Sequence, residues 1–307
     1  MIDIKVSKET LLRIENDFKD YITQRNIGYI IFVAKTNENI ITAYNNKKGI
    51  NFKVTFQGKD YMDLAKKYCE DPSLIHKKKK EDKESLYFID INNQIGSDEV
   101  GTGDFLGPIV VCATYVDINA MKIINEYHIQ DSKKMTDKKI LELIPQIKNR
   151  IHYECKLLPN YKYNNAIKKP TFNINKIKCI MHNYVLFNLK QKCPSIQNIY
   201  MDQFLDKEKY YSYLKNVNNV VKDITFKEKG ETYFPSVALA SCFARYFFLE
   251  YMKELEVKYQ TTIPLGASKD VDEFSINFVK KYGINELENI CKANFKNLSG
   301  IKKEISF

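Results

Sequence analysis

Two adjacent carboxylates, Asp98 and Glu99, stand where a short apolar run meets a glycine-rich turn. A strand interior seldom carries such a pair, because a buried carboxylate is costly unless it is neutralised or meets a cation. Carboxylate oxygens suit hard cations such as Mg²⁺ and Mn²⁺. The glycines that follow, Gly101 and Gly103, allow the backbone to pass close to a bulky group. The segment predicts metal-bound carboxylates beside a surface that admits a phosphate or a sugar, and a β-hairpin with a solvated acidic end is the alternative.

Two later segments also place a carboxylate near the end of a predicted strand. The apolar run 198–204 contains Asp202, and Glu231 stands between the strand predicted over 220–227 and a helix that begins near Ser236. Two divalent ions about 3.5–4 Å apart need several carboxylates that converge from a rigid sheet. For each residue alone, a surface or helix-capping carboxylate is the simpler interpretation. Their joint placement is what indicates a two-metal site.

The fourth carboxylate of such a site has two candidates. Glu231 is favoured by its distance to the following helix, and Asp206 competes with it because it lies one helical turn beyond Asp202. A polar loop with Ser132 and Lys133 precedes another predicted helix. A lysine beside an acidic metal site could contact phosphate or moderate the charge, and an ordinary loop before a helix is the alternative interpretation.

The elements expected around these residues form a mixed sheet. The predicted strands cover 94–100, 107–116, 151–157, 198–204 and 220–227, and the predicted helices cover 136–149, 174–190, 236–254 and 270–282. The fourth and fifth strands follow helical crossovers, so each should lie parallel to a neighbour. We therefore expect a five-stranded mixed sheet flanked by helices, with Asp98 and Asp202 on neighbouring strands.

A smaller α+β unit precedes this sheet in the chain. Ser7 is a candidate N-cap for a helix predicted over 7–26. Strand-like runs at 29–34, 40–44 and 52–56 and a helical stretch at 61–68 complete the unit. The charged run 76–84 is typical of a solvated linker, with a nucleic-acid contact as the alternative. We expect a first domain over 1–75, a linker over 76–86 and a second domain over 87–307.

Composition excludes several classes of protein. Apolar residues make up 44% and charged residues 28% of the 307 residues, which is ordinary for a globular protein and not for a disordered one. Seven cysteines without CxxC spacing predict reduced, mostly packing thiols, with neither a disulfide framework nor a zinc site. Because the sequence lacks a signal-like N-terminus and any membrane-length apolar run, we expect a cytoplasmic protein without membrane contact.

The formal net charge of +10 favours polyanionic partners, of which nucleic acid is the commonest. A composition rich in Lys, Ile and Asn also arises from genome base bias, so charge alone decides little. An acidic metal site on a basic chain is the electrostatic arrangement expected of a phosphodiester-cleaving enzyme. The basic surface holds the nucleic-acid backbone, and the metal ions serve the chemistry.

Several segments in chain order carry a family resemblance. They are Gly96-Ser97-Asp98-Glu99-Val100-Gly101-Thr102-Gly103-Asp104, Asp131-Ser132-Lys133, Asn175-Lys176-Ile177-Lys178, Met201-Asp202-Gln203-Phe204, Glu231 with the helix Ser236–Arg245, and Pro264-Leu265-Gly266-Ala267-Ser268. Together they resemble bacterial ribonuclease HIII, of the type 2 ribonuclease H family, over nearly the whole chain. Thr102 is similar to that family, whereas ribonuclease HII has Arg at this place.

The resemblance implies an RNase H-like catalytic fold behind a TATA-binding-protein-like substrate-binding domain. It implies dependence on Mg²⁺ or Mn²⁺ and endonucleolytic cleavage of the RNA strand of RNA–DNA hybrids, with 5′-phosphate and 3′-hydroxyl ends. The catalytic and metal-binding residues it implies are Asp98, Glu99, Asp202 and Glu231, and the substrate-binding residues are Gly101, Thr102, Gly103, Ser132, Lys133 and Ser268. No obligate protein partner is inferred. Incision at single embedded ribonucleotides, as in ribonuclease HII, and non-catalytic hybrid binding remain the alternatives.

Overall fold

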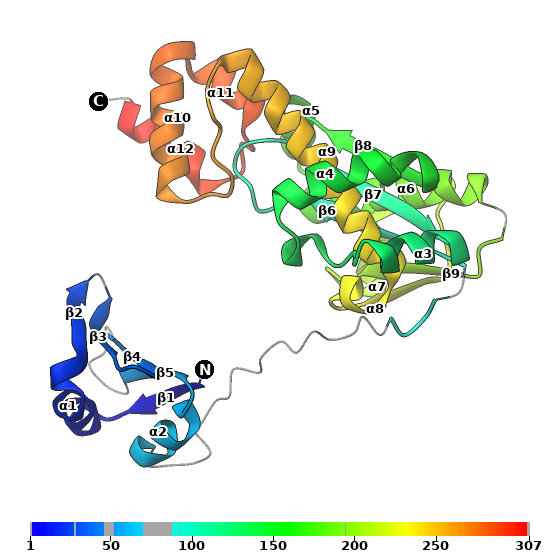
Figure 1. Ribbon diagram of the computed structural model, residues 1–307. Coiled ribbons are helices and arrows are strands. Elements are labelled where there is room, and N and C mark those ends of the chain that lie inside the picture. Colours follow the sequence, from blue (N-terminus) through cyan, green and yellow to red (C-terminus); the bar gives the residue numbers. More distant parts are fainter. Residues whose placement is uncertain are drawn as a thin grey trace. The chain divides into compact units, whose positions relative to one another are not determined.

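The chain, described by a computed structural model, divides into two compact units, Met1–Ser85 and Leu86–Phe307 (Figure 1). The structure describes residues 2–27, 29–45, 52–69, 88–91, 93–193 and 195–305. The predicted linker over 76–86 lies wholly outside the described residues, as does the boundary at residue 75. The domain limits given above therefore stay a prediction.

An antiparallel sheet with strand order β1-β5-β4-β3-β2 forms the first unit. Its elements are β1 (Ile2–Val6), α1 (Lys8–Asp17), β2 (Ile22–Ile27), β3 (Ile30–Lys35), β4 (Asn39–Tyr44), β5 (Phe52–Gly58) and α2 (Tyr61–Tyr68). Alternate strand residues face the two helices and build one core, in which Phe32, Phe56 and Tyr68 are the largest buried side chains. Ser7 caps α1 as predicted, since its side chain accepts a hydrogen bond from the Thr10 amide.

The helix predicted over 7–26 is wrong in its second half. Helix α1 ends at Asp17, and residues 22–27 form strand β2, which pairs with β3. Leu11, Ile14 and Phe18 do follow helical spacing, but Ile22 and Ile27 belong to a segment whose backbone hydrogen bonds are supplied by a neighbouring strand. Pairing between segments overrides a local helical pattern here, as it often does for short β-prone segments.

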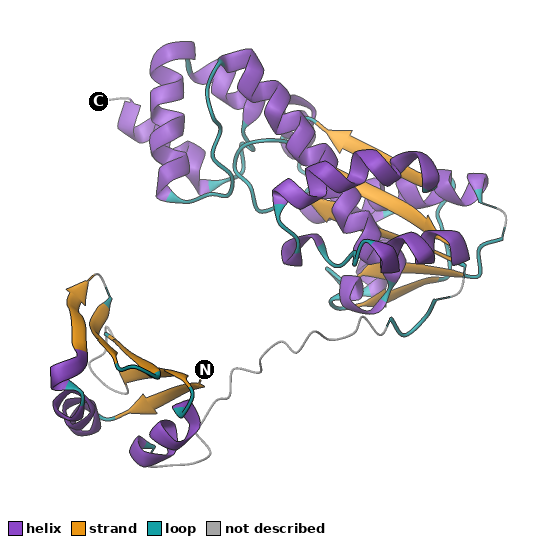
Figure 2. Cartoon of the chain, in the orientation of Figure 1, coloured by secondary structure: helices purple, strands orange, loops and turns teal. Residues whose placement is uncertain are grey.

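A five-stranded mixed sheet forms the second unit, with strand order β10-β9-β6-β7-β8 (Figure 2). The strands are β6 (Gln94–Val100), β7 (Ile109–Val116), β8 (Tyr153–Leu158), β9 (Asn198–Asp202) and β10 (Ile224–Lys227). Strands β6, β7 and β8 pair antiparallel, whereas β9 lies parallel to both β6 and β10. The mixed sheet and its parallel crossovers confirm the predicted fold.

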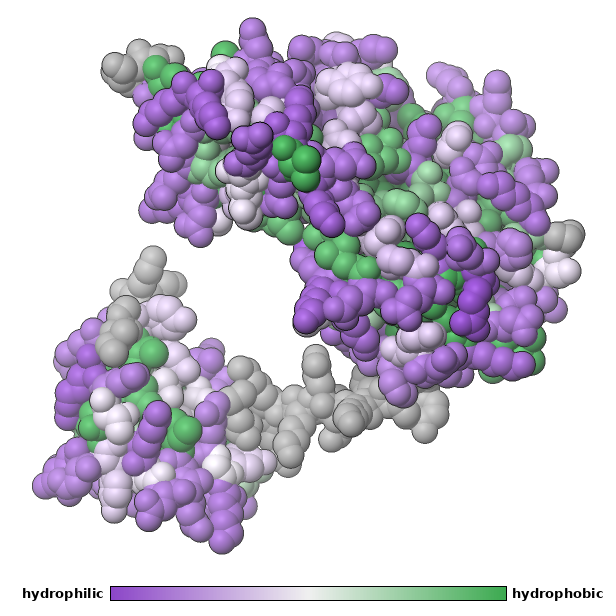
Figure 3. Space-filling view, turned by 45° about the horizontal axis from the view of Figure 1, so that its top comes forward, coloured by the Kyte–Doolittle hydropathy of each residue, from purple (hydrophilic) through white to green (hydrophobic). Residues whose placement is uncertain are grey.

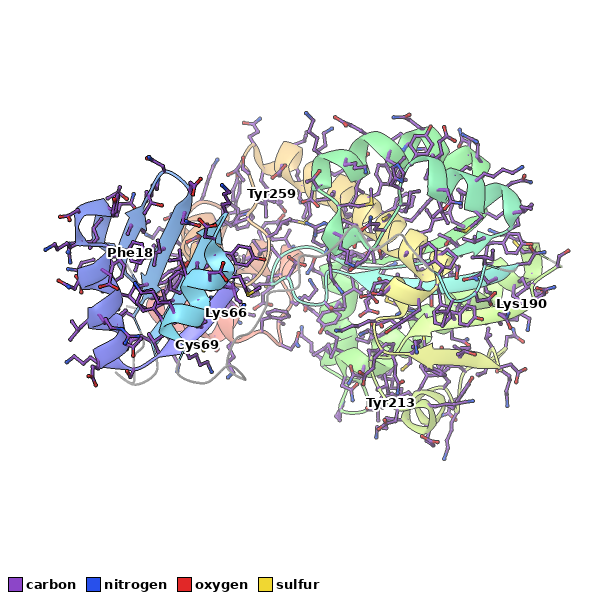
Figure 4. The ribbon with its side chains drawn as sticks, turned by 60° about the horizontal axis from the view of Figure 1, so that its bottom comes forward. Phe18, Lys66, Cys69, Lys190, Tyr213 and Tyr259 are labelled. Atoms are coloured by element: carbon purple, nitrogen blue, oxygen red, sulfur yellow. A yellow bond between two sulfur atoms is a disulfide. The ribbon has the colours of Figure 1, made fainter. Side chains whose placement is uncertain are left out.

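Helices cover both faces of this sheet. The helices are α3 (Ile118–Glu126), α4 (Asp137–Ile147), α5 (Asn160–Ile167), α6 (Ile174–Lys192), α7 (Lys207–Tyr213), α8 (Gly230–Tyr233), α9 (Pro235–Tyr259), α10 (Lys269–Tyr282), α11 (Ile284–Ile290) and α12 (Lys296–Ile305). Helix α9 contacts β6 and β7 from one face, and α6 contacts β6, β7 and β8 from the other. Helices α10, α11 and α12 group together near the C-terminal end of α9, which Tyr259 marks in Figure 4.

Close packing of α9 on β6 depends on Gly96. A Cβ atom at this position would lie 2.4 Å from Ser236 Oγ and 2.7 Å from the Val237 nitrogen. The helix start is also held by hydrogen bonds, because Ser236 Oγ donates to Gln94 Oε1 at 2.6 Å and Thr114 Oγ1 donates to the Ser236 carbonyl at 2.8 Å. These contacts fix the segment that follows Glu231 against the strand that carries Asp98.

Two of the seven cysteines correct a prediction. Cys112 and Cys155 form a disulfide between β7 and β8, whereas Cys179, Cys193, Cys242 and Cys291 are free. The two bonded residues face each other in the strand register, with Cα atoms 4.2 Å apart. The prediction of reduced thiols throughout is wrong for this pair, because 43 residues separate the two cysteines in sequence and only the sheet register brings them together.

The outer surface of the chain is mostly hydrophilic on the face that Figure 3 shows, with small hydrophobic areas between the charged side chains. Among the described residues, no helix combines the length and the apolar character that crossing a membrane requires. Even α9, which spans 25 residues, carries charged side chains over its second half.

Candidate active site

Strand β6 places Asp98 on the face of the sheet that α9 covers. The residue is 8% exposed, and its Oδ1 accepts a hydrogen bond from the Glu99 amide at 2.8 Å. Burial raises the pKa of Asp98 well above its usual 3.8, and the negative charges of Glu99, Asp202 and Glu231 raise it further. Lys133, whose own pKa is raised by the charge of Asp98, offsets this negative charge only in part.

The parallel register brings Asp202 beside Asp98. Ser97 pairs with Met201, so the next residue on each strand is a carboxylate, as the sequence predicted for neighbouring strands. Asp202 is the last residue of β9, and its Oδ1 accepts a hydrogen bond from the Gly230 amide at 2.9 Å. The carboxyl ends of parallel strands thus gather the acidic side chains at one edge of the sheet.

Glu231 lies in the short helix α8 and not at the end of the fifth strand, where it was expected. Strand β10 ends at Lys227, and Lys229 takes a left-handed conformation (φ 56°) that turns the chain before α8 begins. Glu231 is 8% exposed. Burial raises its pKa, as do the charges of Asp202 and Asp131, while Lys133 acts in the opposite direction from 3.8 Å.

Asp206, the competitor of Glu231, is solvent-exposed at the N-terminus of α7. The charges that act on the pKa of Asp98 come from Glu99, Asp202 and Glu231. The two candidates for the fourth carboxylate therefore differ in environment, since one is buried in the acidic cluster and the other is solvated at a helix terminus.

Glu99 occupies a different environment from Asp98, although the two are adjacent in sequence. Its Oε1 lies 2.5 Å from Lys178 Nζ, and its Oε2 lies 2.9 Å from His182 Nε2, both side chains coming from α6. The other ring nitrogen of His182 is 2.8 Å from Ser97 Oγ. Burial alone would raise the pKa of Glu99, but His182 and Lys178 outweigh it and lower the pKa to about 2. The sequence reasoning missed His182, although its i, i+4 spacing from Lys178 on a predicted helix was a signal.

A pocket of about 400 Å³ opens beside the acidic cluster. It is lined by Asp98, Glu99, Val100, Gly101, Thr102, Ser132, Lys133, Met135, Asp137 and Arg245. Gly101 (φ 94°) turns the backbone here, and a Cβ on it would lie 2.1 Å from the Pro108 carbonyl oxygen. Of the predicted substrate-binding residues, Gly103 and Ser268 are not part of the pocket lining, and Ser268 stands at the N-terminus of α10.

Basic side chains flank the pocket. The pKa of Lys133 is raised, because the carboxylates of Asp98, Asp131, Glu231 and Asp202 outweigh the opposing effect of its burial. The Ser132 amide donates to Ser241 Oγ at 2.9 Å, which ties this loop to α9. Arg245 binds both carboxylate oxygens of Asp137 at 2.8 Å. The Lys133 side chain is 77% exposed, so its ammonium group can reach an anionic group that enters the pocket.

Lys292 anchors the loop that follows the glycine-rich turn. Its Nζ donates hydrogen bonds to the carbonyl oxygens of Asp104 at 2.7 Å and Gly107 at 2.6 Å. Asn160 Nδ2 donates to the same Gly107 oxygen at 2.7 Å. Burial lowers the pKa of Lys292 to about 7. Sequence reasoning did not identify this side chain, since nothing local distinguishes one lysine from the many others.

The donor set suits a divalent cation in its chemistry, because carboxylate oxygens prefer Mg²⁺ or Mn²⁺ to softer metals. The pKa values of Asp98 and Glu231 are raised first by burial and then by neighbouring negative charges, and a dication would offset both effects. Within the described ranges, however, no three His, Cys, Asp or Glu side chains stand in positions to hold one ion together. Glu99, in particular, has both oxygens engaged by α6.

Comparisons with known proteins agree with this architecture. The family model described as ribonuclease HII matches residues 95–298, and a domain of unknown function, DUF3378, matches residues 2–82. Ribonuclease HIII of Phytoplasma mali is 46% identical over 206 residues, which cover 67% of this chain and 71% of the relative. Ribonuclease HIII of Enterococcus faecalis is 33% identical and covers 98% of this chain and 97% of its own length.

Solved structures give the same picture. A crystal structure of Bst-RNase HIII in complex with Mn²⁺ matches with a TM-score of 0.66 and 29% identity, covering 99% of this chain and 98% of that one. Ribonuclease H2 from Pyrococcus horikoshii, at 19% identity and a TM-score of 0.59, shares the fold over 70% of this chain.

Proposed function

This chain belongs to the ribonuclease HIII family and is a ribonuclease H enzyme, and on that premise we propose that it cleaves the RNA strand of RNA–DNA hybrids with the help of divalent metal ions. The observation that carries the proposal is the acidic cluster of buried Asp98 and Glu231 and half-buried Asp202 beside an open pocket. A protein that only binds a polyanion gains nothing from such a cluster, because the carboxylates repel phosphate. In metal-assisted hydrolysis, by contrast, these carboxylates would coordinate the metal ions.

Asp98, Asp202 and Glu231 would hold the metal ions, and Glu99 would join them from the adjoining position. When bound, divalent ions lower the pKa of an attacking water and stabilise the departing 3′-oxygen, which gives 5′-phosphate and 3′-hydroxyl ends. The protein's own part is positional. Strands β6 and β9 fix two of the carboxylates, and α8 fixes the third, because its Gly230 amide donates a hydrogen bond to the Asp202 carboxylate. Lys133 would contact the phosphate on the open side of the pocket.

Selectivity for RNA requires a group that senses the 2′-hydroxyl. The backbone at Gly101 and Thr102 is our candidate, because it lines the pocket beside Asp98 and its turn is rigid. Lys292 and Asn160 hold the following loop in place through the Gly107 carbonyl. Thr102 also favours activity on hybrids over the incision at single ribonucleotides that we associate with an arginine at this position.

The first unit would anchor the hybrid. On the sheet face opposite α1 and α2, Lys5 pairs with Lys53 in the strand register, and Lys53 pairs with Tyr44. Lys53 Nζ lies 5.1 Å from the centre of the Tyr44 ring, and Tyr29 stacks on Tyr44 at 6.1 Å. Lysines neutralise phosphates and aromatic rings stack on bases or sugars, so this face suits a nucleic-acid backbone without selecting its sequence.

One assay separates the candidate functions. A uniform RNA–DNA hybrid and a duplex with a single ribonucleotide are each incubated with Mg²⁺, Mn²⁺ or a chelator. Cleavage of the hybrid with either ion, and none with the chelator, is the expected result. Preferred incision at the single ribonucleotide would favour the ribonuclease HII-like alternative, and metal-independent binding without cleavage would favour the non-catalytic one.

Removing residues 1–84 tests the anchoring role of the first unit. The truncated protein should bind hybrid much more weakly, show a flatter dependence of binding on salt, and keep residual metal-dependent cleavage, because lysine–phosphate contacts are lost while the acidic cluster is retained. Binding at several salt concentrations measures both quantities. An unchanged KM and salt slope would show that the first unit is not the anchor.

A further inference from the structure

Helix α6 encloses the Glu99 carboxylate in a buried polar network. Lys178 reaches one oxygen and His182 the other, at 2.5 and 2.9 Å, and Ser97 holds the far side of the His182 ring. The side chain of Lys178 is 9% exposed and that of His182 is fully buried. Glu99 nevertheless lines the pocket together with Asp98. Its carboxylate therefore stands between the pocket and an internal ammonium group.

Phe204 closes the network on the side of β9. The Lys178 Nζ lies 3.6 Å from the centre of the Phe204 ring, and the His182 ring stacks on the same ring at 5.4 Å with an angle of 28° between the planes. Phe204 follows Asp202 by two residues. A desolvated ammonium over an aromatic face is well stabilised. The Phe204 ring therefore stabilises the Lys178 ammonium in the position from which it forms its ion pair with Glu99.

We infer that Lys178 is an internal counter-cation that occupies Glu99 in the metal-free enzyme and competes with a divalent ion for it. The inference rests on the metal site of the proposed function. An oxygen that accepts a short, charge-assisted hydrogen bond from an ammonium cannot at the same time coordinate a divalent ion along that direction. The ammonium also repels a dication that approaches from the pocket.

Two observations support competition over a purely structural pair. Glu99 is engaged on both oxygens by α6, although it lines the same pocket as Asp98. Asp98, on the other face of the same strand, is acted on by Lys133, yet its pKa stays raised, first by burial and then by three neighbouring acids, and a dication would offset these effects. Lys178 therefore keeps the Glu99 carboxylate paired with α6, and a divalent ion must displace the Lys178 ammonium to coordinate Glu99.

The test is a titration of the full-length protein with Mn²⁺ alone, without substrate, in which the free ion is followed by electron paramagnetic resonance. Lys178→Met removes the ammonium and keeps the length of the side chain. We expect the Kd for Mn²⁺ to fall by about tenfold, since one repelling charge next to the site is removed and Glu99 is released. Lys176→Met is the matched control, because Lys176 lies on the same helix with its Nζ over the Phe172 ring and away from Glu99. It should change the Kd by less than about twofold.

A second variant guards against loss of the fold, because Lys178→Met leaves a buried carboxylate with one partner fewer. Lys178→Gln keeps a hydrogen-bond donor for Glu99 without the charge and should also bind Mn²⁺ more tightly than wild type. Adding Glu99→Gln to Lys178→Met should abolish the gain. A Kd that is unchanged or weaker in both single variants would overturn the inference. A wild-type protein that binds no Mn²⁺ would overturn the proposed metal site, and this inference with it.

Discussion

Asp98 and Glu99, which lie on opposite faces of strand β6, have pKa values that are shifted in opposite directions. On the α9 face, Asp98 is surrounded by other acids, and its pKa is raised by burial and by Glu99, Asp202 and Glu231. On the α6 face, burial of Glu99 is outweighed by His182 and Lys178, and its pKa is lowered to about 2. On the α9 face, Lys133 offsets the negative charge only in part, whereas on the α6 face Lys178 and His182 neutralise the charge of Glu99. The comparison shows that Asp98 and Glu99 differ in electrostatic environment, since the protein supplies neutralising cations to Glu99 and only partial compensation to Asp98.

The largest expected effect comes from removing charge on the α9 face. Asp98→Asn or Asp202→Asn should lower kcat by at least about a hundredfold, or roughly 2.7 kcal/mol of barrier, because each carboxylate is expected to hold metal. Hybrid binding should stay near wild type or become tighter, since the carboxylates repel phosphate. Single-turnover cleavage and a separate binding titration measure the two quantities. If Asp98→Asn kept more than about a tenth of kcat, its assignment as a metal ligand would be untenable.

The next largest effect distinguishes Glu231 from Asp206 as the fourth carboxylate of the site. Glu231→Gln should reduce activity far more than Asp206→Asn, because Glu231 is buried beside Asp202 and Asp206 is exposed. A ligand must be held within about half an ångström of its working geometry, which a solvated side chain is not. Both variants are assayed at saturating Mg²⁺ and again at high Mn²⁺. Greater damage from Asp206→Asn would move the site to the turn after β9.

Opposite pKa shifts predict opposite pH responses of the metal-free protein. The pKa of Asp98 is raised from its usual 3.8, so ionising this carboxyl costs stability, and the free energy of unfolding falls as the pH rises through the raised pKa. The pKa of Glu99 is lowered from 4.5 to about 2, so its stabilising contribution is present above pH 4.5 and is lost as the pH falls towards 2.

Urea unfolding in the presence of a chelator, repeated across pH, measures both slopes. Asp98→Asn should flatten the loss of stability on raising the pH, and Glu99→Gln should flatten the loss on acidification. If the two substitutions changed the same limb of the profile, the two carboxylates would share one electrostatic environment, and the contrast between the faces would be lost.

The smallest expected effects lie at the back of the α6 face. His182→Phe removes the hydrogen bonds to Glu99 and Ser97 but leaves Lys178, so the free energy of unfolding should fall by about 1–3 kcal/mol. Ser97→Ala removes one neutral hydrogen bond and should cost about 1 kcal/mol. Denaturant unfolding measures both. A larger loss from Ser97→Ala than from His182→Phe would show that the network is not organised around Glu99.

Local sequence patterns predicted most of the fold of the second unit. The five strands lie within a few residues of their predicted places, and the two parallel pairings follow from the helical crossovers. Thr136, the first residue of the helix predicted over 136–149, caps α4, because its side chain accepts a hydrogen bond from the Lys139 amide. The short helices α3, α5, α7, α8, α11 and α12 were missed, because each spans ten residues or fewer and a helix of that length depends on tertiary packing for its stability.

The sequence by itself determined the chemistry of the site: which carboxylates exist, that Asp98 and Glu99 alternate along a strand, and that Asp202 ends a neighbouring parallel strand. The tertiary structure alone decided that Glu231 reaches the cluster from a short helix, that Cys112 meets Cys155, and that Lys178 and His182 enclose Glu99. The physical reason is the distance along the chain over which each interaction acts. Alternation and capping depend on neighbours within a few residues, whereas the charge that faces each carboxylate is supplied by helices packed from distant parts of the chain.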